Sequence, residues 1–295
     1  MRHSSTSPLL GIIGGSGLYT IDDLMDGYWK QIESPFGKAS DALWFGTLAN
    51  CDVVFLPRHG RGHRIIPSEL NFRANIDVLK RVGVTEILSL SAVGSLKESI
   101  TPGTFVIVDQ FIDRTFARVK SFFTTGLVAH VNFGCPVCKR LGDHIENALQ
   151  TLEILYHRNG TYVVIEGPQF STYAESELYR SWGSDVIGMT NMPEAKLARE
   201  AEMCYASVAI VTDYDCWHPR HGHVSVDEVL KVLKENASKS RSLIQTLIPL
   251  LADRTTPCTQ RCHTALDMAI VTAPDSRSLE VMQSLDVVAG RVLNQ

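Results

Sequence analysis

The sequence ASVAIVTDYDCW, residues 206–217, begins as an apolar run and ends with two carboxylates two residues apart. Such a run, at 206–212, is typical of a buried strand, and open α/β sheets bind ligands beyond the carboxyl ends of their strands. Asp213 and Asp215 would be costly to remove from water there unless they bound a group that needs them. A planar ring with an exocyclic amine and a protonatable ring nitrogen, such as adenine, is a ligand of this kind.

Similar strand-like runs recur along the chain, and helical patterns lie between several of them. Amphipathic spacing or a capping motif marks helices at 71–82, 193–200 and 225–250. The other strand-like runs lie at 9–13, 53–56, 86–90, 104–109, 161–166 and 185–189. This alternation predicts an α/β fold, a single domain with a central mixed, mostly parallel sheet flanked by helices.

No repeat, low-complexity tract or linker interrupts the chain before residue 250. Residues 251–295 begin with a polar stretch and show one more helical pattern around 278–289. A separate second domain is improbable at that length. We therefore expect residues 9–250 to form the main domain and residues 251–295 to form a C-terminal extension packed on it.

The composition excludes several classes of protein. The net charge of −4 differs from the positive charge that is typical of proteins that bind nucleic acid or an anionic membrane. No apolar run reaches the roughly 18–20 residues of a membrane span, and residues 1–8 lack the apolar core of a signal peptide. Seven cysteines, an odd number, argue against a secreted disulfide framework. We expect a cytoplasmic protein.

Three other strand ends carry groups that bind anions. The glycine-rich turn at 14–17 exposes backbone N–H groups and the Ser16 hydroxyl, with a spacing that is neither a dinucleotide fingerprint nor a P-loop. Arg58 could clamp a phosphate through two N–H groups, with His59 as a second donor, and Ser91 follows the next strand. Each feature alone also fits a tight turn or a surface pair. Together they predict one phosphate pocket built from dispersed loops.

Two further loops offer apolar surface. Phe170 could stack on a base, although an aromatic ring that buttresses the core is equally consistent. Met189 ends a strand just before a helix, and its polarizable thioether suits the face of a sugar or another thioether. A methionine at a strand end is also common in protein cores.

Six sequence motifs, and the order in which they occur along the chain, resemble those of the trimeric purine nucleoside phosphorylases, and of the methylthioadenosine branch in particular. The resemblance covers roughly four-fifths of the chain, and it implies a nucleoside phosphorylase domain at 9–250 and a homotrimer. The stretches that carry it are GGSG at 14–17, PRHG at 57–60, NFRAN at 71–75, DQFIDRT at 109–115, EGP at 166–168 and TDYDCW at 212–217.

The resemblance assigns roles to the matching positions. The residues it implies for phosphate are Ser16, Arg58, His59, Ser91, Thr190 and, through its backbone, Ala92. Those it implies for the nucleoside are Phe170 on the base, Met189 on the ribose, Asp213 and Asp215 on the purine, Val226 and Val229 around a 5′-methylthio group, and His130 from a neighbouring subunit. Gln169 and Tyr173 depart from the family pattern, because basic residues are usual there.

The implied reaction is phosphorolysis of S-methyl-5′-thioadenosine to adenine and 5-methylthioribose 1-phosphate, a step of purine and methionine salvage. Phosphate attacks C1′ while the C1′–N9 bond breaks, and the leaving adenine needs a proton at N7. Asp213 is the expected donor, provided that burial and Asp215 raise its pKa well above about 3.9. Asp215 would then accept from the exocyclic amine.

Inorganic phosphate is a co-substrate in this reaction, and neither a metal nor an organic cofactor is expected. The alternative is a purine nucleoside phosphorylase that acts on adenosine, inosine or guanosine. Val226 and Val229 favour a thioether over a 5′-hydroxyl. A nucleotide-binding sensor without catalysis would have no need of the acid at position 213.

The sequence also contains cysteines and histidines that could bind a metal. The stretch CWHPRHGH at 216–223 holds one thiol and three imidazoles, and Cys135 with Cys138 forms a CxxC. A zinc site needs tetrahedral Cys or His ligands, and no second CxxC or paired-histidine spacing completes a recognised pattern. No metal site is therefore expected, while Cys258 and Cys262 would permit a disulfide.

Overall fold

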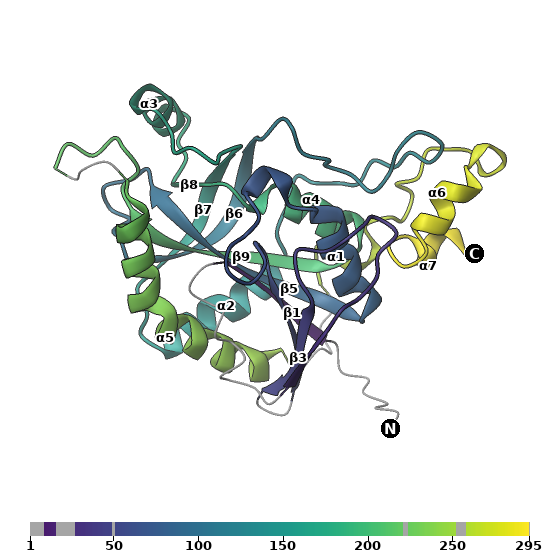
Figure 1. The fold of residues 1–295 in the computed structure, drawn as a ribbon, viewed down its shortest axis with the longest axis horizontal. Helices are drawn as coiled ribbons and strands as arrows, with labels where there is room; N and C mark the ends of the chain where they lie inside the picture. Colours follow the sequence, from purple (N-terminus) through teal and green to yellow (C-terminus); the bar gives the residue numbers. More distant parts are fainter. Residues whose placement is uncertain (1–8, 16–26, 49–50, 221–223, 252–257, 295) are drawn as a thin grey trace.

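A mixed sheet forms the centre of the molecule (Figure 1). The computed structural model describes residues 9–15, 27–48, 51–220, 224–251 and 258–294. Within these ranges nine strands follow the order β2-β3-β4-β1-β5-β8-β7-β6-β9, and β9 pairs again with β5, which closes the last five strands into a ring. The strands are β1 (Leu9–Gly14), β2 (Gly27–Lys30), β3 (Leu43–Leu48), β4 (Cys51–Pro57), β5 (Val84–Ser95), β6 (Phe105–Arg114), β7 (Tyr156–Ile165), β8 (Val186–Gly188) and β9 (Cys204–Asp213).

The seven strands predicted from apolar runs are all present, and the predicted mixed sheet is confirmed. Five of the nine strand pairs within the described ranges are parallel. The prediction missed β2 and β3, which extend the sheet as an antiparallel meander beyond β4. β2 is largely exposed, and β3 is mostly half-buried and contains Gly46 and Thr47, so neither strand is apolar along its whole length as a strand covered on both faces is.

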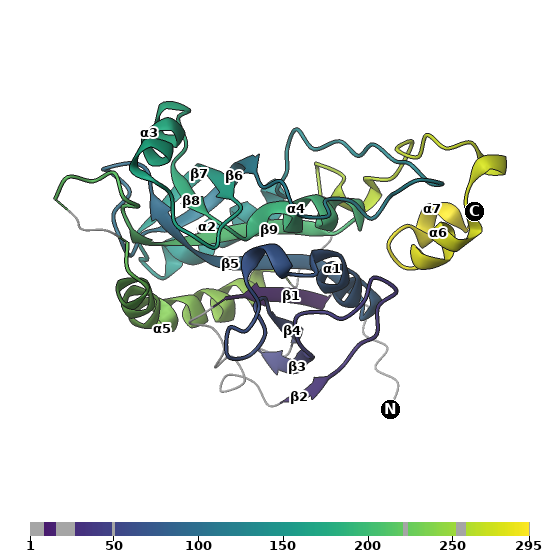
Figure 2. The ribbon, with the colours of Figure 1, turned by 45° about the horizontal axis from the view of Figure 1, so that its top comes forward.

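Helices cover both faces of the sheet (Figures 1 and 2). Side chains of α1 (Phe72–Arg81) and α4 (Asn191–Glu200) belong to one buried hydrophobic cluster. Side chains of α2 (Lys139–Thr151) and α5 (Val226–Leu250) belong to a second cluster on the opposite face. The remaining helices are α3 (Tyr173–Ser181), α6 (Leu279–Ser284), α7 (Gly290–Leu293) and the short 3₁₀ turns η2 (Pro67–Glu69), η3 (Cys262–Thr264) and η4 (Pro274–Ser276).

Capping side chains begin the helices where the sequence predicted them. The Asn71 side chain accepts from Ala74 N at the start of α1, and the Ser225 side chain accepts from Glu228 N at the start of α5. The prediction missed α2 and α3. A capping box marks the start of α3 and was an available signal in the sequence. The Thr172 side chain accepts from Glu175 N, and the Glu175 side chain accepts from Thr172 N.

α5 is the longest helix in the described ranges, and it is amphipathic: its inner face includes Leu243 and Leu247, and lysines and glutamates lie on the outside. None of the helices in these ranges has both the length and the hydrophobicity that a membrane span requires.

Residues 258–294 contact the rest of the chain at several points. Leu285 and Val288 are buried in the cluster that contains α1 and α4. An ion pair joins Arg81 to Asp286, and Arg291 pairs with Glu202. The predicted helix around 278–289 is shorter than expected, because α6 ends at Ser284. The division of the chain at residue 250 stays a prediction.

Replacing Leu243 with alanine should destabilise the fold by about 2–5 kcal/mol, since the side chain is fully buried between α5 and the sheet and its loss leaves a cavity. Leu178→Ala is the matched control, because Leu178 on α3 is 47% exposed and its truncation should change stability by less than about 0.5 kcal/mol. Denaturant unfolding measures both variants. Equal losses would contradict the assignment of Leu243 to the core.

Candidate active site

A cavity of about 320 Å³ lies at the carboxyl ends of β4, β5, β8 and β9. Its volume is in the range of small-molecule sites, and the first half of α5 forms one wall. Most of the predicted site residues lie in its lining, which includes Arg58, His59, Ser91, Ala92, Phe170, Met189, Thr190, Asp213, Asp215, Val226 and Val229.

Asp213, the last residue of β9, is a largely buried carboxyl group. Its Oδ1 accepts from Asp215 N at 2.7 Å and its Oδ2 accepts from Thr212 Oγ1 at 2.7 Å. Gly94 lies opposite on β5, where a Cβ would be only 2.9 Å from Asp213 Oδ1, so only glycine leaves room for the acid. Burial raises the pKa of Asp213 to about 6, and the nearby charge of Asp215 adds to the effect. The carboxyl group can therefore hold a proton far closer to neutral pH than an ordinary aspartate.

Asp215 lies beside this acid in an unusual backbone conformation. Its φ of 51° is in the left-handed region, which costs free energy in a residue other than glycine and is typical of functional sites. Its side chain is buried, and burial raises its pKa. The two-residue spacing thus places two desolvated carboxyl groups at one edge of the cavity.

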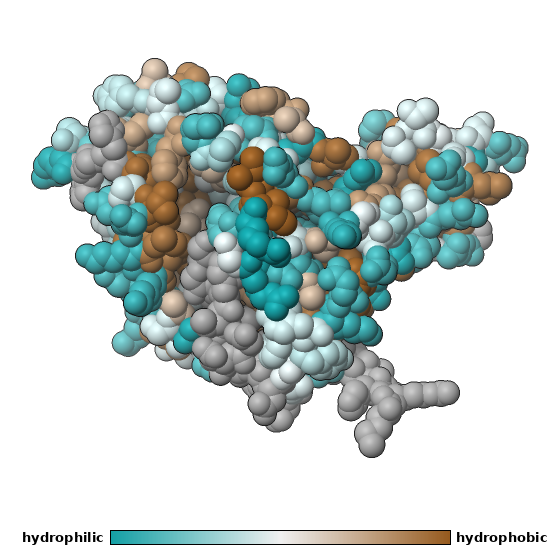
Figure 3. Space-filling model, in the orientation of Figure 1, coloured by the Kyte–Doolittle hydropathy of each residue, from teal (hydrophilic) through white to brown (hydrophobic). Residues whose placement is uncertain are grey.

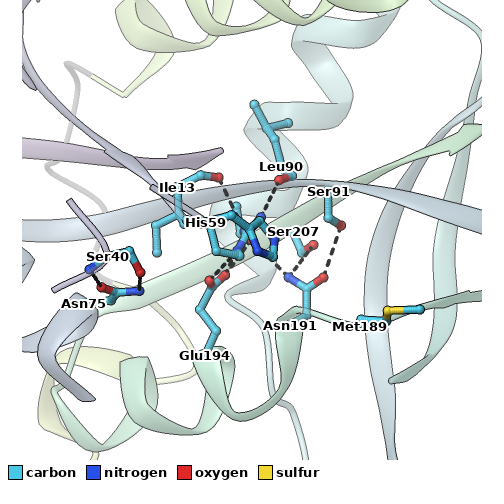
Figure 4. A network of polar contacts seen from close by, with 12 residues as sticks. Ile13, Ser40, His59, Asn75, Leu90, Ser91, Met189, Asn191, Glu194 and Ser207 are labelled. Atoms are coloured by element: carbon cyan, nitrogen blue, oxygen red, sulfur yellow. Dashed lines mark hydrogen bonds and ion pairs between the residues drawn. The ribbon is translucent and has the colours of Figure 1, made fainter. Parts of the chain in front are cut away.

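Arg58 is fully buried beneath the cavity, where it forms an ion pair with Glu194 (Nε–Oε2 2.8 Å). Its Nη1 donates to the Leu90 carbonyl at 2.9 Å, and its Nη2 donates to Glu194 and to Ser89 Oγ. Figure 4 shows Glu194, from α4, pointing into this network beside the backbone of the neighbouring strands.

Among the described residues, only the Leu90 carbonyl accepts from Arg58 Nη1, so one N–H of this nitrogen has no acceptor there. Nη1 lies near Gly15, on which a Cβ would be 3.8 Å away. The sequence suggested a phosphate clamp made of two N–H groups. The structure corrects this expectation, because Glu194 and the strand ends occupy the other donors of the guanidinium.

His59 is buried next to Arg58 and stacks on the ring of His63 at a centroid distance of 4.3 Å. Burial and the Arg58 charge lower the pKa of His59 to about 3, so the ring is neutral. Its Nδ1 lies 2.9 Å from the Ile65 carbonyl, which can only accept, and Nδ1 therefore carries the hydrogen. Nε2 is left with a lone pair, so the neutral ring is an acceptor there and not the donor that the sequence suggested.

Two hydroxyl groups complete the polar side of the cavity. Ser91 Oγ donates to Asn191 Oδ1 at 3.2 Å. Thr190 Oγ1 is buried and lies near the buried Tyr162 hydroxyl, and neither oxygen makes a hydrogen bond of good geometry among the described residues. A buried hydroxyl without such a bond is costly, which points to a ligand that supplies one.

The other side of the cavity is apolar. Phe170 and Met189 line it from the β7–α3 loop and the end of β8, and Val226 and Val229 line it from the first turns of α5. In the space-filling view hydrophobic side chains gather beside α5 (Figure 3). Leu233 continues this wall and was not predicted, although it follows Val226 and Val229 at helical spacing.

Two predicted residues are not placed in the cavity. Ser16 lies outside the described residues. His130 is exposed, its backbone N–H donates to the Ala269 carbonyl, and it does not belong to the described lining of its own chain's cavity. Gln169 and Tyr173, which depart from the family pattern, are both exposed, and neither belongs to this lining.

Sequence reasoning missed the residues that support the cavity from below. Asn191 Nδ2 donates to Ser89 Oγ, Tyr205 OH and Ser207 Oγ, and Glu194 also accepts from Tyr205 OH at 2.8 Å. Figure 4 shows Asn191 and Glu194 on the same helix, facing the strands. The helix carries several charged residues, so nothing in its sequence distinguishes Asn191 and Glu194 as the two that face the strands.

The metal pattern considered at 216–223 is not assembled in the described residues. Cys216 Sγ donates to the Ser171 carbonyl, whereas His218 contacts Glu98 on another loop. His221 and His223 lie outside the described residues. Cys135 is exposed and Cys138 is buried, and the described cysteines, Cys258 and Cys262 included, are free thiols.

Comparison with known proteins agrees with this geometry. Residues 9–249 match the family described as the phosphorylase superfamily. The chain therefore belongs to the phosphorylase superfamily.

Similar proteins show to which branch of the superfamily the chain belongs. The chain is 59% identical to S-methyl-5′-thioadenosine phosphorylase of Rhodospirillum rubrum, over 99% of this chain and 100% of the relative. It is 54% identical to the protein of the same name from Bradyrhizobium diazoefficiens, over 98% and 99% of the two chains. Within the superfamily, the chain belongs to the S-methyl-5′-thioadenosine phosphorylases.

Solved structures show the same fold. A methylthioadenosine phosphorylase from an antarctic soil metagenomic library superposes with a TM-score of 0.89 at 46% identity, covering 96% of this chain and 99% of that one. Methylthioadenosine phosphorylase from Schistosoma mansoni, in complex with adenine, superposes with a TM-score of 0.84 at 36% identity, covering 92% and 99%. The expected nucleoside phosphorylase fold is confirmed.

Asp213→Asn should stabilise the protein above pH 6 and leave its stability unchanged near pH 3. The folded carboxyl group holds its proton up to a pH of about 6, whereas the unfolded one loses it near 3.8, so the fold loses stability as the pH rises between these values. A shift of this size corresponds to roughly 2–3 kcal/mol, which a neutral amide avoids.

Thermal unfolding across the pH range measures this effect. Asp275→Asn is the matched control, because Asp275 is exposed in η4 and its substitution should leave the pH dependence as it is in the wild type. An Asp213→Asn variant whose stability follows the wild type in parallel at every pH would show that the Asp213 carboxyl is not desolvated.

Proposed function

We propose that this protein catalyses the phosphorolysis of S-methyl-5′-thioadenosine to adenine and 5-methylthioribose 1-phosphate. The observation that carries the proposal is the buried carboxyl group of Asp213, with its raised pKa, in a cavity that has polar groups for phosphate on one side and an apolar wall on the other. The relatives' activity and the adenine complex of the Schistosoma mansoni structure support it.

Asp213 supplies the proton in the proposed reaction. An oxygen of phosphate forms a bond to C1′, the C1′–N9 bond breaks, and its electron pair passes to the purine. The protonated Asp213 donates to N7, which neutralises the leaving base. Asp215, held two residues away in a fixed backbone conformation, accepts from the exocyclic amine.

The phosphate lies in this proposal on the polar side of the cavity. Thr190 Oγ1, which makes no hydrogen bond of good geometry among the described residues, and the remaining N–H of Arg58 Nη1 donate to its oxygens. The neutral His59 accepts the P–OH hydrogen of hydrogen phosphate through Nε2. This orientation directs the deprotonated oxygens, which are the nucleophiles, away from His59. The Ser91 hydroxyl and the Ala92 backbone complete the site, and Ser16 remains an expected member of it.

The apolar wall favours a thioether over a hydroxyl at the 5′ position. Val226, Val229 and Leu233 on α5 form this wall, and a 5′-hydroxyl placed against them would lose its hydrogen bonds to water. Phe170 contacts the base and Met189 the ribose. Adenosine is therefore a poorer substrate, and inosine and guanosine are poorer still, because their O6 has no hydrogen to donate to either of the two carboxyl groups, Asp213 and Asp215.

We also propose a cytoplasmic homotrimer whose cavity is completed by His130 of a neighbouring subunit. His130 lies in a segment that exposes the apolar side chains of Phe116 (82%) and Val119 (58%), which a contact between subunits would bury. Light scattering should give three chains, and a monomer with full activity would contradict the proposal. Residues 9–250 form the catalytic domain in this proposal, with 251–295 as its extension.

Adenine release from S-methyl-5′-thioadenosine should depend strictly on inorganic phosphate. Equal release in phosphate-free buffer would show a hydrolase and defeat the proposal. Thr190→Val, which removes only the hydroxyl, should raise the KM for phosphate by roughly 10–100-fold, the value of one hydrogen bond to a charged group. Thr151→Val is the control, since its hydroxyl is exposed on α2 and bonds to its own helix. A KM for phosphate that does not change in Thr190→Val removes Thr190 from the site.

Asp213→Asn should lower activity on S-methyl-5′-thioadenosine by roughly 10²–10⁴-fold, the usual effect of removing a general acid. The variant should also discriminate less against methylthioinosine, because an amide can donate to a 6-oxo group where a carboxylate can only accept. Parallel assays on the two nucleosides measure both effects.

Asp215→Asn is the matched comparison, with the same chemical change two residues away. It should weaken adenine binding and cost less activity, because it removes a partner of the amine but not the proton. Comparable losses of activity in both variants, with an unchanged preference between the two bases, would show that Asp213 and Asp215 do not determine which base is bound.

A further inference from the structure

Four cysteines from distant parts of the chain meet at the end of the sheet opposite the cavity. Cys138 is the N-cap of α2, Cys204 is the first residue of β9, and Cys258 and Cys262 belong to the segment that follows α5. All four are buried, and their Sγ atoms lie within 4.8 Å of one another.

We propose that these four cysteines bind one Zn²⁺ ion as thiolates. In a tetrahedral site with Zn–S bonds of about 2.3 Å, the sulfurs lie about 3.8 Å apart. The Sγ atoms of Cys138 and Cys258 are 3.5 Å apart, and those of Cys258 and Cys262 are 3.4 Å apart. Four sulfurs around one centre, without oxygen or nitrogen ligands, form a donor set typical of zinc.

The arrangement differs from that of two disulfides. Two bonded pairs would separate the sulfurs into two groups, whereas Cys258 lies almost equally close to two different cysteines. The described cysteines are free thiols. A simple packing of thiols is the other possibility, because a buried cysteine behaves as a small apolar side chain.

Hydrogen bonds next to the cysteines hold their backbones together independently of the sulfurs. Cys138 N donates to the Tyr205 carbonyl at 2.7 Å, which joins the start of α2 to the start of β9. Lys139 N donates to Gln260 Oε1 at 2.5 Å, which joins α2 to the loop between the last two cysteines. Arg261 N donates to the Cys258 carbonyl at 2.9 Å and closes that loop. The polypeptide therefore prearranges all three segments, as a metal site requires.

A cation lies next to the cluster and would offset part of the charge of such a site. Four thiolates around Zn²⁺ carry a net charge of −2, which is costly in a buried position. The Arg140 guanidinium lies beside the cluster, with Nη2 3.8 Å from Cys204 Sγ, and it also pairs with Glu86. Arg140 would thus donate a hydrogen bond to the Cys204 thiolate and stabilise its negative charge.

The site is structural in this proposal. All four ligand positions are filled by protein, which leaves none for water or substrate. Cys204 begins β9 and Asp213 ends it, and nine residues of strand correspond to roughly 30 Å. The ion would fasten residues 258–262, and the segment that continues from them, to α2 and β9.

The spacing of the cysteines explains why sequence reasoning missed this site. The CxxC of Cys135 and Cys138 suggested a pair, but Cys135 is exposed and only Cys138 joins the cluster. The other three ligands come from far along the chain, so the fold alone brings them together.

Metal analysis of the full-length protein, purified under reducing conditions without chelator, tests the proposal. We expect about one zinc per chain. Removal of zinc and replacement by Co²⁺ should give the visible absorption of tetrahedral cobalt thiolate, a signal that does not depend on activity. Cys258→Ser and Cys262→Ser should lose most of the zinc. Cys135→Ser and Cys51→Ser are matched controls outside the cluster and should keep it.

Two results would overturn the proposal. One is wild-type protein with far less than one zinc per chain, seven titratable thiols and no cobalt absorption, which would show a simple packing of thiols. The other is an intact mass lower by four hydrogens without bound metal, which would show two disulfides. Both measurements use wild-type protein, so a variant that fails to fold does not obscure the answer.

Discussion

The buried ion pair between Arg58 and Glu194 is the interaction on which the site depends. It joins the end of β4 to α4, and the same guanidinium donates to the end of β5 through Leu90 and Ser89. A buried charge that loses its partner costs several kcal/mol, so helix and strand ends are held in one arrangement. Asn191 extends this network to β9 through Tyr205 and Ser207. The floor of the cavity is therefore fixed before any ligand binds, which is what catalysis by positioning requires.

β9 connects the two chemical centres of the molecule. Its carboxyl end places Asp213 and Asp215 in the cavity, and its amino end places Cys204 in the thiol cluster. At the first end burial works against stability, because it raises the pKa of a carboxyl group that would otherwise ionise freely. At the second end the proposed zinc would add stability by joining three segments. A strand buried along nearly its whole length supplies the rigidity that both ends need.

The sequence predicted those features that local patterns encode. Strands that are covered on both faces have apolar runs in the sequence, so seven strands were predicted, whereas β2, which is largely exposed, and β3, which is mostly half-buried, were not. The rule that ligands bind at the carboxyl ends of strands placed Asp213 and Asp215 in one cavity. Glu194 was missed as a partner of Arg58 because 136 residues separate them, and the cysteine cluster was missed for the same reason. The acceptor role of His59 depends on the Ile65 carbonyl, which no spacing reveals.

Departure of the base depends on a buried, protonated Asp213 in this mechanism. The pH dependence of kcat/KM for S-methyl-5′-thioadenosine at saturating phosphate tests it most directly, because this parameter reports the ionisation of essential groups before the nucleoside binds. We expect kcat/KM to fall as the pH rises through an apparent pKa of about 6 or somewhat higher, with phosphate bound, and we expect this fall to be absent in Asp213→Asn. A kcat/KM that does not fall up to about pH 8, or a fall that persists in Asp213→Asn, would contradict it.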